Sequence, residues 1–90
     1  MEVKHGNQRF YIGEEEQSPL AEMTYVNSGD KLIIIDHTEV SEALKGQGAG
    51  RLLLKELTDW VRGEGKKIMP LCPYAKVQME RNEEYHDLIY

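Results

Sequence analysis

Cysteine, clustered basic residues and long apolar runs are all scarce in this chain of 90 residues. The single cysteine, Cys72, cannot form an internal disulfide and is typical of a protein from a reducing compartment. No apolar run approaches the roughly 20 residues that cross a bilayer, and the first residues lack the apolar centre of a signal peptide. We therefore expect a cytoplasmic protein that makes no membrane contact.

Positive charge is also in short supply, with 11 Lys and Arg residues against 16 Asp and Glu residues and a net charge of −5. Proteins bind phosphate backbones through clustered Lys and Arg, so we expect no nucleic-acid partner. Acidity of this degree fits a basic or polyamine-like partner, but it also serves simply to keep a small protein soluble. The length predicts one domain over residues 1–90, and we expect a monomer or a weak dimer.

The first half of the chain has the pattern of β-strands joined by turns. Strands are predicted over residues 9–12, 20–26 and 31–36, because each is rich in β-branched and aromatic side chains and is bounded by turn residues. The short connections predict a three-stranded antiparallel meander. The last of these strands is continuously apolar, so we expect both of its faces to be covered.

The second half changes to a helical period. Apolar residues recur at Leu53, Leu57, Trp60 and Val61, which predicts a helix of about four turns from residue 49. A strand over residues 66–72 follows, and a right-handed crossover would place it parallel to the third strand. A short helix over residues 74–81 and an apolar anchor over 88–90 complete a fold of the α+β (α/β) class.

Pro70 lies inside the predicted parallel strand. Proline cannot donate a hydrogen bond to the sheet, so this strand should lie at an edge or diverge from its neighbour partway along. Divergence would open a cleft at the end where His37 and Cys72 lie.

A glycine-rich turn separates the third strand from the long helix. Gly46, Gly48 and Gly50 alternate with other residues there, so the backbone can approach a ligand closely while the helix N-terminus favours negative charge. The turn suits a pyrophosphate. It is not a Walker A motif, because no Gly-Lys-Ser/Thr follows, and Arg51 stands where the dinucleotide-binding fingerprint needs glycine.

The run Lys45-Gly46-Gln47-Gly48-Ala49-Gly50 resembles the pyrophosphate loop of GNAT-type N-acetyltransferases. The chain is similar in particular to a minimal GNAT-like group that carries His-Thr before the loop, here His37-Thr38, and a cysteine after the next strand, here Cys72. The resemblance extends from about Phe10 to the C-terminus and implies a truncated GNAT-like fold. Larger members have two helices after their first strand, and these helices help to shape the acceptor site, whereas this chain passes from strand to strand.

The resemblance also implies the ligand and its contacts. Acetyl-CoA would be the cosubstrate, with no metal. Backbone groups near Thr38, Glu39 and Val40 would pair with the pantetheine. The pyrophosphate would be held by the loop and by the first N–H of the helix, that is by Lys45, Gly46, Gln47, Gly48, Ala49, Gly50 and Arg51.

Acetyl transfer needs a nucleophile, a group that takes its proton and a donor for the developing charge. Cys72 is the candidate nucleophile and would need a helix N-terminus or a cation, such as the His37 imidazole, to activate it. A buried and inert cysteine is the plain alternative. His37 and Glu39 are candidate bases and Tyr74 is a candidate acid. The three histidines are too dispersed to predict a zinc site.

Three functions remain open at this point. The first is an acetyl-CoA-dependent N-acetyltransferase with an unknown amine or protein acceptor, acting by direct attack of the amine or through acetyl-Cys72. The alternative is a noncatalytic acyl-CoA-binding or sensing module, suggested by the absent acceptor-site helices. The third is a small structural domain whose glycine turn binds nothing.

Overall fold

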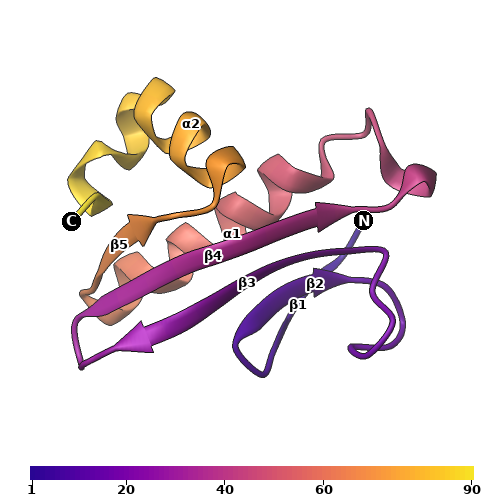
Figure 1. The fold of residues 1–90 in the computed structure, drawn as a ribbon, viewed down its shortest axis with the longest axis horizontal. Coiled ribbons are helices and arrows are strands. Elements are labelled where there is room, and N and C mark those ends of the chain that lie inside the picture. The colour runs from indigo at the N-terminus through magenta and orange to yellow at the C-terminus, as the bar shows by residue number, and fades with distance from the viewer.

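A computed structural model describes all 90 residues as a five-stranded sheet with α-helices packed against it (Figure 1). The strands are β1 (Val3–Gly6), β2 (Arg9–Ile12), β3 (Ala21–Ser28), β4 (Leu32–Val40) and β5 (Lys67–Pro70), and the helices are α1 (Ala49–Glu64) and α2 (Pro73–Arg81). Two 3₁₀ segments, Glu42–Leu44 and Glu83–Leu88, precede α1 and follow α2. Neither α-helix combines the length and apolar composition that a membrane span requires.

The strand order follows the sequence, β1-β2-β3-β4-β5, with antiparallel pairing up to β4 and parallel pairing between β4 and β5. The predicted fold class is therefore confirmed, including the meander, the crossover helix and the parallel strand. The meander has one strand more than predicted, β1, and β4 extends to Val40, beyond the predicted end at residue 36.

Strand β1 owes its place to a contact that is distant in sequence. The ring of His5 stacks on Phe10 with centroids 4.0 Å apart and meets the edge of Trp60 at 4.7 Å. Its Nε2 lies 2.7 Å from the hydroxyl of Tyr25. A short strand of mixed polarity is thus held by aromatic packing against β2, β3 and α1, which its own four residues do not signal.

The hydrophobic core lies on one face of the sheet only. It joins alternate residues of β2, β3 and β4 to the apolar stripe of α1 and to α2, and its members from these elements are Phe10, Ile12, Ala21, Met23, Tyr25, Ile33, Ile35, Ala49, Leu53, Leu54, Leu57, Val61, Ala75 and Met79. Because both helices contribute to this one cluster, no helical layer covers the opposite face. The expectation that the third predicted strand is covered on both faces is wrong, since Leu32 and Ile34 are only half-buried.

The uncovered side of the sheet is called the open face below. It carries the alternate, mostly polar residues of β3 and β4, among them Glu22, Thr24, His37 and Glu39, all half-buried or exposed.

Strands β4 and β5 separate partway along, as Pro70 predicted. Their pairing runs from Leu32 opposite Lys67 to Ile35 opposite Pro70 and then stops. The N–H groups of Leu71 and Cys72 both donate to the carbonyl of Ile35, each at 3.0 Å, so the chain turns away there. Strand β4 continues to Val40 with no partner on the side of β5.

We expect His5 to make stability depend on pH. Partial burial lowers the pKa of the His5 imidazole below its usual 6.5, because charging the ring loses solvation. The unfolded chain therefore binds the proton more readily, and folding stability that is present above about pH 6.5 is lost as the pH falls through the lower pKa of the folded state. His5→Phe keeps an aromatic ring that cannot be charged. In urea titrations from about pH 5 to pH 8, the wild type should gain stability relative to His5→Phe as the pH rises. Parallel pH profiles for the two proteins would contradict this.

Candidate functional site

The glycine turn leads into α1 with part of its backbone in the left-handed conformation. Gly46 and Gly48 both have φ of 79°, a conformation that side chains disfavour, and Gly48 is the residue that caps the helix. No side chain caps the N-terminus and the first turn holds no acidic residue. The first N–H groups of the helix thus keep the partial positive charge of the helix end and have no intrahelical acceptors.

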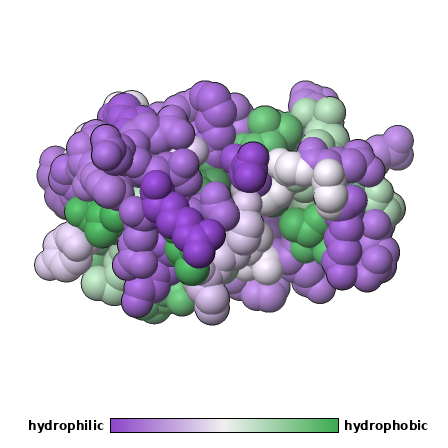
Figure 2. Space-filling model, turned by 90° about the horizontal axis from the view of Figure 1, so that it is seen from above, coloured by the Kyte–Doolittle hydropathy of each residue, from purple (hydrophilic) through white to green (hydrophobic).

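A pocket of about 270 Å³ adjoins this turn, at the place where β4 has lost its β5 partner. It is lined by the end of β4, the glycine turn and the start of α2: Thr38, Val40, Leu44, Lys45, Gly46, Gly48, Ala49, Gly50 and Tyr74. Figure 2 shows pale and green residues side by side toward its right-hand end, the end of the molecule where Figure 1 places the turn, and others along its lower left. Most of the predicted ligand-binding residues therefore share one pocket. Leu44, on the 3₁₀ segment before the turn, was not predicted to line it.

Tyr74 lines this pocket with its ring packed close to Gly50. A Cβ atom at Gly50 would lie 2.8 Å from Cζ and from the hydroxyl oxygen of Tyr74, so glycine allows the ring to approach the backbone of α1. Burial raises the pKa of the Tyr74 hydroxyl, and the nearby Arg51 cation offsets the effect only in part. At neutral pH the hydroxyl is therefore protonated and can donate.

Cys72 lies immediately before α2 and does not itself line the pocket, but it contacts Thr38, which does. Its Sγ is 3.1 Å from Oγ1 of Thr38, and the residue is 4% exposed. The β3–β4 pairing shifts register between Thr24 and Tyr25, so Asp36 has no residue opposite it on β3. This bulge turns the Thr38 side chain to the same face as Ile35. The sequence indicated Thr38 only through its backbone, and its side-chain contact with Cys72 depends on this bulge.

His37 and Glu39 lie on the open face, on the side of β4 away from Thr38. Nε2 of His37 is 3.6 Å from Oε1 of Glu39, and the two side chains are 57% and 71% exposed. The structure thus separates the candidate chemical residues into two pairs. Cys72 and Tyr74 lie beside the pocket, whereas His37 contacts Glu39 rather than Cys72.

The polar side chains of the turn differ in whether they already have a hydrogen-bond or ion-pair partner within the protein. Nζ of Lys45 lies 2.8 Å from Oε1 of Glu42 in an exposed ion pair, and the side-chain amide of Gln47 donates to the carbonyl of Ala43. Gln47 does not line the pocket. Arg51 makes no ion pair or side-chain hydrogen bond, and it borders a second hollow of about 290 Å³ between α1 and the segment that follows α2.

Comparisons with known proteins give the same relationship from both sequence and structure. A family model described as GCN5-related N-acetyl-transferase matches residues 9–88. The solution structure of a GCN5-like protein from Staphylococcus aureus, proposed to be an N-acetyltransferase, has a TM-score of 0.84 to this chain at 42% sequence identity. The alignment covers 99% of this chain and 87% of that one. No curated protein sequence matches the chain.

The burial of Cys72 predicts slow reaction with a bulky aromatic disulfide reagent. If the thiol reacts only after a local opening that costs about 3 kcal/mol, the folded protein will react on the order of 100-fold more slowly than the protein in urea. Thr38→Ala should react faster than the wild type, because it removes the Oγ1 contact and leaves space beside Sγ. The absorbance of the released thiolate measures both rates. Equal rates in the folded and unfolded protein would show that Cys72 is accessible.

Proposed function

Because the chain belongs to the GCN5-related N-acetyltransferase family, we propose that it binds acetyl-CoA in the pocket between β4, the glycine turn and α2 and transfers the acetyl group to an amine. The observation that carries this proposal is the coincidence of two independent features at one place. The β4–β5 pairing ends at Ile35, which leaves the last part of β4 without a neighbour on that side. The N-terminus of α1, which no side chain caps, lies beside this free part of β4.

The pyrophosphate fits the glycine turn on electrostatic grounds. The turn offers the N–H groups at the start of α1, and these attract an anion without any side chain. Arg51, on the first turn of the helix, adds an unpaired cation near Tyr74, although it borders the neighbouring hollow rather than this pocket. Lys45 can contribute only by leaving Glu42, which costs little because exposed ion pairs are worth less than about 1 kcal/mol.

The pantetheine fits the free edge of β4. Residues beyond Ile35 pair with β3 on one side only, so the backbone groups of Thr38, Glu39 and Val40 that face away from β3 have no strand partner. An extended amide-containing chain can take up such groups in the way an added strand does. Val40 and Tyr74 supply apolar surface beside this edge.

Cys72 and Tyr74 are the residues that we assign to the covalent route. The Cys72 thiol gives up its proton to water, its sulfur bonds to the thioester carbonyl carbon, and the bond from that carbon to the CoA sulfur breaks. The departing CoA thiolate takes a proton from the Tyr74 hydroxyl, which lines the pocket in its protonated form, and water then returns a proton to Tyr74. The acceptor amine then attacks acetyl-Cys72, loses a proton and restores the thiol.

His37 and Glu39 are assigned to the acceptor. Both lie on the open face, so they serve as bases for an amine that approaches from that side of the sheet. In the direct route, the amine attacks the thioester itself and Cys72 remains a thiol.

A noncatalytic acyl-CoA-binding or sensing module is the second candidate. It is favoured by one observation, the 4% exposure of Cys72, because a buried thiol in contact with Thr38 is poorly placed to meet a thioester. Binding without turnover would identify this function.

Binding of CoA at the glycine turn is tested by a matched pair of substitutions, Gly48→Asp and Gly48→Asn. The two side chains have the same shape, and both tolerate the left-handed conformation better than other residues do. Only Asp places a negative charge beside the pyrophosphate. We expect Gly48→Asp to bind CoA at least about tenfold more weakly than Gly48→Asn, a difference of about 1.4 kcal/mol. Calorimetric titration measures it, and equal affinities would show that the pyrophosphate lies elsewhere.

The covalent route predicts an acetylated protein. Intact-mass measurement after mixing with acetyl-CoA should find one acetyl group on the wild type and none on Cys72→Ala, provided that Cys72→Ala still binds CoA in the same titration. Turnover of a panel of amines by Cys72→Ala at the wild-type rate would favour direct attack. Tight CoA binding with neither adduct nor turnover would leave the noncatalytic module.

A further inference from the structure

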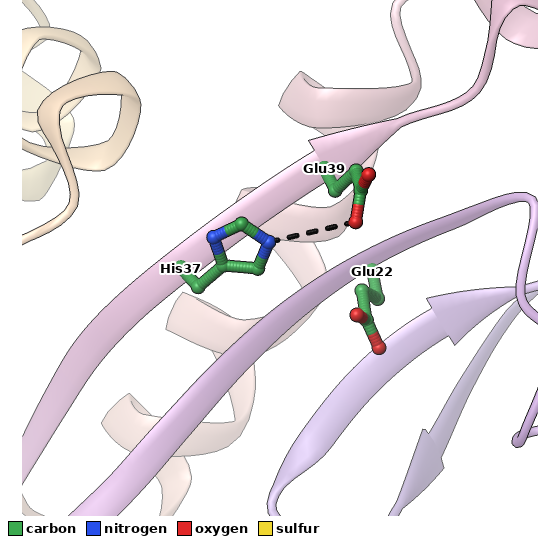
Figure 3. Close-up of side chains that lie close together, drawn as sticks. All are labelled: Glu22, His37 and Glu39. Carbon is green, nitrogen blue, oxygen red and sulfur yellow. Dashed lines mark ion pairs between the residues drawn. The ribbon is translucent and has the colours of Figure 1, made fainter.

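Three side chains that can bind a metal ion converge on the open face. Glu22 from β3 and His37 and Glu39 from β4 each offer one ligand atom, and these atoms all lie within 4.8 Å of one another (Figure 3). The register explains the grouping. Glu22 is the direct cross-strand partner of Glu39, and His37 is two residues away from Glu39 on the same face of β4.

The charges of this group are not balanced within the sheet. Two carboxylates directly opposite each other destabilise a strand pair. Arg9 relieves part of this, because its Nη1 lies 2.9 Å from Oε1 of Glu22. Glu39 has only the His37 imidazole, at 3.6 Å, and no Lys or Arg partner.

A buried hydroxyl group near the two carboxylates lacks a hydrogen-bond partner. Oγ of Ser41 is buried and forms no hydrogen bond. Ser41 and both carboxylate residues line one cavity of about 170 Å³. A buried hydroxyl without a partner costs free energy, which a water molecule held in this cavity would recover.

We propose that Glu22, His37 and Glu39 bind a divalent transition-metal ion of the zinc type. The two carboxylates supply negative charge that such an ion neutralises, and the imidazole supplies a nitrogen ligand. The imidazole favours a transition metal over magnesium or calcium, which take oxygen ligands. Three protein ligands leave a position open for water, the ligand count of a reactive zinc site rather than a closed structural one.

The side chains differ in how they are held, and the differences suit this role. Glu22 is 18% exposed and is fixed through one oxygen by Arg9, as a hydrogen-bonded ligand carboxylate usually is. His37 and Glu39 are largely exposed, so small rotations bring their ligand atoms within the roughly 2.0 to 2.2 Å that zinc requires.

The ligand side chains lie on the face of the sheet away from Thr38 and do not line the pocket assigned to acetyl-CoA, to which Glu39 contributes only its backbone. The site does bear on the acceptor side of the reaction. An imidazole nitrogen that binds an ion cannot accept a proton, so metal binding would remove His37 as a base.

The test uses tag-free protein, stripped of metal with a chelator and titrated with zinc chloride at about pH 7.5, because metal binding competes with protons and is stronger at this pH than in acid. Imidazole NMR signals report on each histidine, and His5 and His86 serve as internal references. We expect the His37 signals alone to shift, with saturation at one equivalent of zinc. Shifts at His5 or His86, or no saturable shift at His37, would overturn the proposal.

Variants separate this site from the general acidity of the protein. His37→Asn and Glu22→Gln should each weaken zinc binding by at least about tenfold. Glu14→Gln, at an exposed residue outside the group, and Cys72→Ser, which removes the one thiol, should bind zinc like the wild type. His37→Asn replaces an exposed side chain and should fold, which its thermal unfolding confirms. Unchanged zinc affinity in His37→Asn would overturn the proposal. So would a Cys72→Ser protein that no longer binds zinc.

Discussion

The hydrogen bonds between β4 and β5 end at the carbonyl of Ile35, and the rest of the candidate site depends on that end. Pro70 has no N–H to extend the parallel pairing, and the next two N–H groups, from Leu71 and Cys72, converge on the same carbonyl. The chain then turns into α2, which begins at Pro73. Strand β4 therefore keeps a free edge, and the pocket lies along it. The Ile35 carbonyl, which accepts both hydrogen bonds, thus sets the position of the pocket, of Cys72 and of Tyr74.

The second constraint is that one helical layer covers one face of the sheet. A chain of 90 residues has a limited core, and here α1, α2 and the inward residues of the strands form a single cluster. The open face is consequently free of packing demands. It can carry Glu22, His37 and Glu39 close together, because these side chains meet solvent and one another instead of a buried apolar layer. In a chain with helices on both faces, the same residues would have to be buried or replaced.

The sequence predicted those parts of the structure that depend on local chemistry. The apolar period of residues 53–61 predicted α1, the glycines predicted a tight turn ahead of this helix, and Pro70 predicted the separation of the strands. Features that depend on distant partners were not predicted. Strand β1 is held by the contacts of His5 with aromatic rings from three other elements. Glu22 joins Glu39 only because of the β3–β4 register, which the alternation of polar residues leaves open.

The bulge at Asp36 shows how a single unpaired residue reassigns candidate roles. Without it, simple alternation from Ile35 would turn His37 toward the core face and Thr38 toward solvent. With it, Thr38 meets Cys72, and His37 joins Glu39 on the other face. Adjacent residues of β4 thus serve opposite sides of the sheet. Beyond Ile35 the two sides meet at the free edge of β4, since β3 covers its other edge. In the reaction proposed above, an acceptor on the open face would therefore reach the thioester around the same edge that we assign to acetyl-CoA.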